Sequence, residues 1–189
     1  SVAPGKSIDL GTFKSELGSE DEVSIEEFVD GVMVNMFWDE EEEEWEIATR
    51  SSVGGRVSFF TTGAFNTPTT FRYMFLECIN ETEMIEGVKT PWMDNLDRSV
   101  CYSFVLRHPR HRIVSPVDKP GLALVDMYRI DKENPLVVHQ LQLTDESAAG
   151  IPDTVTRPMN LAFGTPSTDI ARLEEQYNGG GMNWSLVGV

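Results

Sequence analysis

The sequence predicts an α+β fold, in which hairpins of antiparallel strands are combined with intervening helices. Two alternating runs rich in β-forming residues, at positions 32–37 and 45–49, predict the two strands of one hairpin. A nearly continuous apolar run at 100–106 predicts a further strand that is buried on both faces. Between these strands, apolar residues recur at helical spacing from Phe71 onward.

The chain has 189 residues and a mass of 21.2 kDa, which fits one domain over residues 1–189. Its last residues, 184–189, begin a strand pattern and then stop, so we expect a partial domain that is truncated at the C-terminus. No run approaches the roughly 18 apolar residues of a membrane-spanning helix, and residues 1–10 lack the apolar centre of a secretion signal. We therefore expect an intracellular protein with no membrane partner.

The N-terminal elements follow in order along the chain. Residues 1–22 are polar and irregular, with a short helix expected within residues 8–17, capped by Asp9. The hairpin comes next, and its connection at residues 39–44 consists of acidic residues alone. Because adjacent carboxylates on a flexible tip rarely converge on a cation, we interpret this run as a solvated tip rather than a metal site. Residues 51–55 then read as a loop.

The remaining elements are two helices, a short turn and four strands. The first helix is expected over residues 71–80, capped by Thr69 or Thr70, and a short turn or helix follows at Thr90. Strands are expected at 100–106, 113–114, 122–130 and 137–143. A second helix is expected at 167–177, ended by the glycines of residues 179–181.

Sulfur and histidine chemistry is sparse. The two cysteines, Cys78 and Cys101, sit in apolar runs and are predicted to be buried free thiols. The chain has three histidines and no Cys-x-x-Cys pair, so we predict no metal site. His108 and His111 flank an arginine-rich turn and are expected to be surface residues rather than general bases. No phosphate-binding glycine loop and no serine nucleophile elbow is present.

Charge is unevenly placed in this acidic chain. Lys and Arg number 15 against 31 Asp and Glu, which gives a net charge of −16 and argues against a nonspecific nucleic-acid surface. Positive charge is nevertheless concentrated in the turn that contains Arg107, Arg110 and Arg112, where no acidic residue intervenes. A second cation, Arg50, follows the hairpin. We expect these arginines to form an anion-binding face, with the turn at its rim.

Several short motifs occur in a fixed order. Asp30-Gly31 precedes the first strand, Thr49-Arg50-Ser51-Ser52 follows the hairpin, and Phe104 lies on the apolar strand before Pro109-Arg110-His111-Arg112-Ile113-Val114. Leu186-Val187-Gly188-Val189 ends the chain. In this order the motifs resemble the adenylation domain of the T-even bacteriophage type of RNA ligase and its relatives in large DNA viruses. The resemblance spans residues 26–189, and it implies a nucleotidyltransferase-like domain of antiparallel sheets with flanking helices, of viral or cytoplasmic location.

What the resemblance implies about function is adenylyl transfer from ATP, with magnesium, to a nucleic-acid 5′ end. The nucleotide-binding residues would be Asp30, Gly31, Arg50 and Phe104, with Asp30-Gly31 and Phe104 on facing strands around one concave site. In these roles, Gly31 would allow a close approach of the backbone, Arg50 would hold a phosphate, and Phe104 would stack on a purine. From the residues alone, Phe104 is equally a core aromatic, Gly31 a bulge glycine and Arg50 a surface arginine.

The sequence departs from the family pattern at the positions that carry its chemistry. The nucleophilic lysine of the family corresponds to Phe28, which cannot form a lysyl-adenylate. Two family glutamates correspond to Val105 and Val187, and the final lysine motif lies beyond the end of the chain. The catalytic nucleophile is therefore unassigned, with Lys6 or Lys14 as the open substitute.

Three hypotheses remain at this stage. The first is an RNA-ligase-like nucleotidyltransferase, with a nucleotide and RNA as its partners. The second is a catalytically dead member of the same fold that serves as a binding or structural module, for which the acidic composition suits a protein partner. The third is an unrelated α+β domain whose motifs match by chance.

Overall fold

The computed structural model describes residues 27–57, 70–79, 92–111, 117–131, 133–134 and 136–159. Contacts divide the chain into two compact units, and Val29–Pro158 contains every helix and strand described below. In the other unit, the Glu27 N–H donates to the Met159 carbonyl at 2.9 Å. The elements expected at 8–17, 113–114, 167–177 and 184–189 lie outside the described residues.

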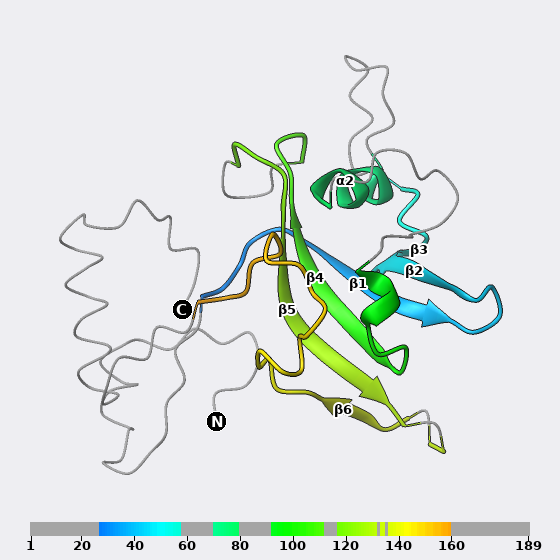
Figure 1. Ribbon diagram of the computed structural model, residues 1–189. Helices are drawn as coiled ribbons and strands as arrows, with labels where there is room; N and C mark the ends of the chain where they lie inside the picture. Colours follow the sequence, from blue (N-terminus) through cyan, green and yellow to red (C-terminus); the bar gives the residue numbers. More distant parts are fainter. Residues whose placement is uncertain are drawn as a thin grey trace, which may run out of the picture. The chain divides into compact units, whose positions relative to one another are not determined.

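One antiparallel sheet of six strands dominates the larger unit (Figure 1). Its order is β3-β2-β1-β4-β5-β6, and every pair of neighbours is antiparallel. The strands are β1 (Val32–Asp39), β2 (Glu44–Thr49), β3 (Ser52–Val53), β4 (Val100–Arg107), β5 (Gly121–Ile130) and β6 (Val138–Gln140). With one α-helix in the connection from β3 to β4, the described part has the mixed α+β character that the sequence predicts.

The helix α2 (Phe71–Cys78) begins where the sequence predicts it and ends two residues earlier. The Thr70 hydroxyl accepts a hydrogen bond from the Tyr73 N–H at 3.2 Å, which is the expected N-cap. A short 3-10 turn, η1 (Met93–Asn95), follows before β4 and corresponds to the turn predicted near Thr90.

The acidic connection between β1 and β2 is an exposed hairpin tip, as predicted. Residues 40–43 form the turn and are exposed, while Asp39 and Glu44 close it as a cross-strand pair. The Asp39 carboxylate accepts hydrogen bonds from the N–H groups of Glu41, at 2.9 Å, and Glu42. An aspartate in this position replaces the backbone partners that the turn residues lack.

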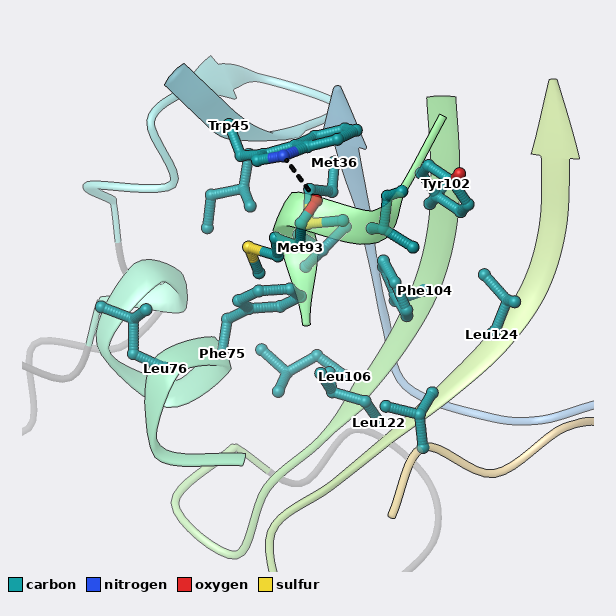
Figure 2. Close-up of a cluster of buried hydrophobic side chains, with 14 of the residues drawn as sticks. Met36, Trp45, Phe75, Leu76, Met93, Tyr102, Phe104, Leu106, Leu122 and Leu124 are labelled. Atoms are coloured by element: carbon teal, nitrogen blue, oxygen red, sulfur yellow. Dashed lines mark hydrogen bonds between the residues drawn. The ribbon is translucent and has the colours of Figure 1, made fainter. Parts of the chain in front are cut away.

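The hydrophobic core lies between one face of the sheet and the segment that carries α2 and η1 (Figure 2). Phe75 of α2 packs edge-on against Phe104 of β4, with ring centroids 5.7 Å apart, and both rings are fully buried. The Trp45 indole N–H donates to the Met93 carbonyl at 3.1 Å, which ties η1 to the hairpin. Other buried members include Val34, Met36, Ile47, Tyr102, Leu106, Leu122, Leu124 and Met127.

Three details of the sheet differ from the sequence prediction. Ser52 and Val53, predicted as loop, pair with β2 as the short strand β3. The strand predicted at 137–143 is confined to β6, and the Leu141 N–H makes one further hydrogen bond to the Met127 carbonyl of β5 at 2.9 Å. The pairing of β4 with β5 shifts register between Ser103 and Phe104, a β-bulge that the apolar pattern did not indicate.

The cysteines are free thiols, as predicted, although each is half-buried rather than fully buried. Burial and, to a smaller extent, the neighbouring Glu77 carboxylate together raise the pKa of Cys78 to about 12. Burial also raises the pKa of Cys101. Because the thiolate is the reactive form, neither side chain has the character of a nucleophile.

The contact between Phe75 and Phe104 should dominate the stability of the larger unit. We expect F75A to lower the free energy of unfolding by about 3–5 kcal/mol, since it leaves a cavity under Phe104. Urea unfolding followed by tryptophan fluorescence measures the change. F28A is the matched control, because Phe28 is 72% exposed and its removal should cost less than about 0.5 kcal/mol. Equal losses in the two variants would contradict this description of the core.

Candidate functional site

The residues singled out from the sequence gather at one end of the sheet. Asn35 of β1 pairs with Ala48 of β2, so Gly31 and Arg50 both lie beyond this pair in the same direction. Val32 pairs with Leu106, which places Arg107 of β4 at that same end. Asp30, Gly31, Arg50 and the start of the basic turn therefore lie toward the same end of the strands.

Gly31 has a steric reason to be glycine. A Cβ atom at this position would lie 2.6 Å from the Leu106 carbonyl oxygen and 2.6 Å from Cγ1 of Val105. No larger residue fits without moving β1 away from β4, because such approaches are shorter than any ordinary contact. The close backbone approach expected at Gly31 is thus made to the neighbouring strand β4.

Phe104 lies on a neighbouring strand rather than a facing one. β1 and β4 are hydrogen-bonded partners, with Val34 opposite Phe104, so the expectation of facing strands is wrong. Phe104 is fully buried in the core with Phe75, whereas the Cβ position of Gly31 points toward Val105 on the other face of the sheet. The structure places Phe104 as a core aromatic, which is one of the two interpretations that the sequence left open.

Arg50 is an exposed residue in the tight turn between β2 and β3. Thr49 and Ser52 form the last pair of this hairpin, so Arg50 and Ser51 are its two turn residues. Among the described residues, no ion pair involves Arg50. An exposed cation at the end of the sheet is free to meet an anion in solution, which agrees with the role predicted for it without testing that role.

The basic turn after β4 is less positive than its sequence indicates. Arg110 Nη2 donates to the Glu77 carboxylate of α2 at 2.5 Å, and its guanidinium lies over the Tyr73 ring. Arg107 extends from the end of β4 with its Nε buried and without a hydrogen-bond partner. Arg112 lies outside the described residues. The acid that balances Arg110 is distant in sequence, so sequence reasoning could not find it.

His108 is a buried link between the turn and α2, and the expectation of a surface histidine is wrong for it. Its Nδ1 accepts the Arg110 N–H at 3.1 Å, so the proton sits on Nε2, 3.2 Å from the Glu77 carboxylate. Burial lowers the pKa of His108 below its ordinary value, partly opposed by Glu77, and burial also lowers the pKa of His111. A neutral, enclosed imidazole with both nitrogens engaged is a structural group rather than a general base.

A row of polar side chains crosses the face of the sheet that is opposite the core. Asn35, Ser103 and Asp126 are successive cross-strand neighbours on β1, β4 and β5. The Ser103 hydroxyl donates to Asn35 Oδ1 at 2.7 Å, and Gln140 of β6 donates to Asp126 at 3.0 Å. Each of these residues is a polar residue within a strand, which is the sequence signal that could have identified the row.

Tyr128 completes this polar row. Its hydroxyl donates to Asp126 Oδ2 at 2.5 Å, and this hydrogen bond raises the pKa of Tyr128 to about 12. The phenol is therefore a hydrogen-bond donor at neutral pH. The row joins four strands laterally through carboxylate, amide and hydroxyl groups, of which the Ser103 hydroxyl is buried.

A second feature that sequence reasoning missed is a buried ion pair at the start of α2. Nη1 of Arg72 donates to Oε1 of Glu46 and to the Gly54 carbonyl, the latter at 3.2 Å. Arg72 is 6% exposed, which is rare for arginine outside a paired or liganded position. Because the partners are 26 positions apart in sequence, only the fold brings them together.

The described part of the chain contains neither a cluster of metal-binding side chains nor a membrane-spanning helix. No group of three or more histidine, cysteine, aspartate or glutamate side chains there is close enough to hold a metal ion. None of the helices described is both long enough and apolar enough to cross a membrane.

Comparison with curated proteins gives one informative match. The sequence is similar to an RNA ligase. That protein comes from Rhodothermus phage RM378, and the two chains are 30% identical over 110 residues. The match covers 57% of this chain and 23% of the phage protein, so the chain spans less than a quarter of that RNA ligase. No protein-family model matches the sequence.

The buried histidine should make stability depend on pH near neutrality. Because its folded pKa lies below 6.5, the unfolded chain binds more protons, and stability is lost as pH falls from 6.5 toward the folded pKa. The slope is limited to about 1.4 kcal/mol per pH unit for each proton. Urea unfolding between pH 5.5 and 7.5 should show this slope in the native chain and a smaller one in H108Q. H139Q, at an exposed position on β6, should keep the native slope; loss in H139Q alone would contradict the assignment.

Proposed function

We propose that this chain is an RNA-ligase-like nucleotidyltransferase domain, which takes part in ATP-dependent adenylyl transfer to nucleic-acid 5′ ends. The observation that carries the proposal is the similarity of 110 residues to a phage RNA ligase. It is supported by the order of the motifs, which resembles that of the T-even type, and by the gathering of Asp30, Gly31 and Arg50 at one end of the sheet. Since the chain spans 23% of the relative, the activity of the whole relative is a proposal for this chain.

The described residues fit part of a nucleotide site. Arg50 is exposed and can hold a phosphate through two parallel hydrogen bonds, which a planar guanidinium does better than an ammonium group. Phe104 fits less well, because stacking on a purine would require its ring to leave the core. Bound ATP and magnesium would supply the activated phosphoanhydride; the contribution of this chain's own residues is binding and orientation of that anion.

A second function is favoured by one specific residue. Phe28 stands at the position of the family's nucleophilic lysine and is 72% exposed, and a phenyl ring cannot accept an adenylyl group. A catalytically dead member of the fold would keep the binding surface and lose the covalent step. In that case the acidic surface suits a protein partner, and nucleotide binding, if retained, would leave no covalent product.

A labelling experiment separates the two functions. The full chain is incubated with ATP labelled in the α-phosphate and with magnesium, and intact-mass and peptide mass spectrometry then locate any AMP adduct. An adduct on lysine, abolished in K6R or K14R, supports the transferase. Absence of an adduct together with measurable ATP binding supports the catalytically dead module. Absence of both ATP and RNA binding would refute the proposed function in either form.

Arg50 provides the quantitative prediction for nucleotide binding. We expect R50A to weaken ATP binding by roughly 1.5–3 kcal/mol, the value of a charge-assisted contact, without loss of stability, because the side chain is exposed. Isothermal titration calorimetry gives the affinity. R157A is the matched control, since Arg157 is paired with Asp145 and lies beside β5, away from the β2–β3 edge. Unchanged affinity in R50A would remove Arg50 from the site.

A further inference from the structure

Only one of the three nitrogen atoms in the buried guanidinium of Arg72 has hydrogen-bond partners. Its Nη1 contacts Glu46 and the Gly54 carbonyl, but Nε and Nη2 are buried and have no hydrogen-bond partner. Buried donors without partners are uncommon in folded proteins, because each gives up its hydrogen bonds to water and receives nothing in return. The residue that carries them is 94% buried, since its exposed fraction is 6%.

The two free nitrogens have a defined geometry. In a guanidinium, Nε–H and one N–H of Nη2 point the same way and form the side edge, which matches the two oxygen atoms of a planar or tetrahedral oxyanion. The group cannot rotate away to seek water, because Nη1 is held by Glu46 and by Gly54. The carboxylate of Glu46 is itself fixed, since its Oε1 also accepts the Ile47 N–H at 2.7 Å.

A second cation lies at the turn that Arg72 contacts through Nη1. A Cβ atom built on Gly54 would lie 3.5 Å from Cγ and from Nε of Arg56, so Arg56 passes close to the glycine that binds Arg72. Arg56 is exposed, whereas Arg72 is buried. Arg72 also stands on the second residue of α2, at the positive end of the helix dipole.

The amide groups at the start of α2 are already occupied. The Phe71 N–H donates to the Val57 carbonyl and the Arg72 N–H donates to the Gly55 carbonyl, at 3.1 and 2.9 Å. Gly54 and Gly55 both adopt positive φ, which lets the chain turn tightly under the helix. The helix start therefore offers no free amide for an anion, and the unsatisfied donors belong to the Arg72 side chain.

We propose that the side edge of Arg72, with Arg56, binds a phosphate group at the corner formed by β2, the Gly54-Gly55 turn and α2. An oxyanion there would satisfy both buried donors, while Glu46 positions the guanidinium and balances one of the two positive charges. The choice of phosphate over carboxylate rests on the proposed function; the need for an oxyanion rests on the geometry of Arg72. The phosphate belongs either to a mononucleotide or to an RNA 5′ end.

Arginine-selective NMR tests the site directly. The Nε–H resonances of the ¹⁵N-labelled full chain are followed during titration with inorganic phosphate, against sodium chloride at equal ionic strength. We expect the Arg72 Nε–H resonance to shift saturably with phosphate and to stay in place with chloride. No shift at Arg72 under saturating phosphate would overturn the proposal. Because the native chain is observed, this readout does not require any variant to fold.

Variants then measure the contribution of each cation. R72K keeps the charge but loses the side edge, and we expect phosphate affinity to fall about tenfold or more. R56Q changes an exposed residue, and we expect a decrease of about threefold, in the range of one exposed charge contact. R157Q makes the same charge change beside β5 and should leave the affinity unchanged. Equal decreases in R56Q and R157Q would show screening by net charge alone and would overturn the proposal.

Further titrations distinguish the source of the phosphate and separate this inference from the proposed function. ATP and short RNAs with either a 5′-phosphate or a 5′-hydroxyl are compared by the same Arg72 resonance. A shift with ATP assigns a mononucleotide; a shift only with the 5′-phosphorylated RNA assigns the RNA end. ATP or RNA binding that leaves Arg72 unmoved and is unchanged in R72K overturns this site and leaves the proposed function standing. Phosphate binding at Arg72 without ATP or RNA binding upholds the site and refutes the function.

Discussion

The pairing of β1 with β4 holds two separate hairpin assemblies together. β1, β2 and β3 follow one another in sequence and in the sheet, and so do β4, β5 and β6. Val32 to Met36 of β1 align with Tyr102 to Leu106 of β4, so this one seam joins the two halves into a continuous sheet. The same pairing brings the C-terminal ends of β2 and β4 to the end of the sheet where Gly31 lies. A seam between segments so distant in sequence forms only after a large loop has closed, which makes it the entropically costly step of folding.

Gly31 marks how tightly that seam is closed. Its backbone lies against Leu106 and Val105 at a separation that excludes any side chain. Phe75 of α2 packs against Phe104 of β4. The connection from β3 to β4, which separates the two halves in sequence, therefore also covers their common core. Strand pairing and helix packing therefore depend on one another, and neither half has a complete core alone.

Local patterns predicted local structure well. Alternating residues predicted the hairpin of β1 and β2. A threonine followed by apolar residues at helical spacing predicted α2 and its cap, and a continuous apolar run predicted β4, which is buried on both faces. The sheet order could not be predicted, because it depends on which strands meet after a long connection. Nor could the partners of charged side chains: Glu77 balances Arg110, and Glu46 holds Arg72, across 33 and 26 positions of sequence. The turn that contains Arg110 is therefore less positive in the structure than its sequence indicates, while the anion-binding role predicted for it stays a prediction. Phe104, for which the sequence left both a core and a ligand role open, lies in the core.

The described sheet ends in two short edge strands. β3 has two residues and β6 has three, and exposed valines lie on both, Val53 at one edge and Val138 at the other. A long apolar edge would present a continuous ladder of unpaired backbone groups to a second molecule. Here any intermolecular ladder would stop after one or two hydrogen-bonded pairs, while a net charge of −16 opposes the approach of a second copy. At these two edges of the described sheet, short strands and net charge together oppose the addition of strands from a second chain.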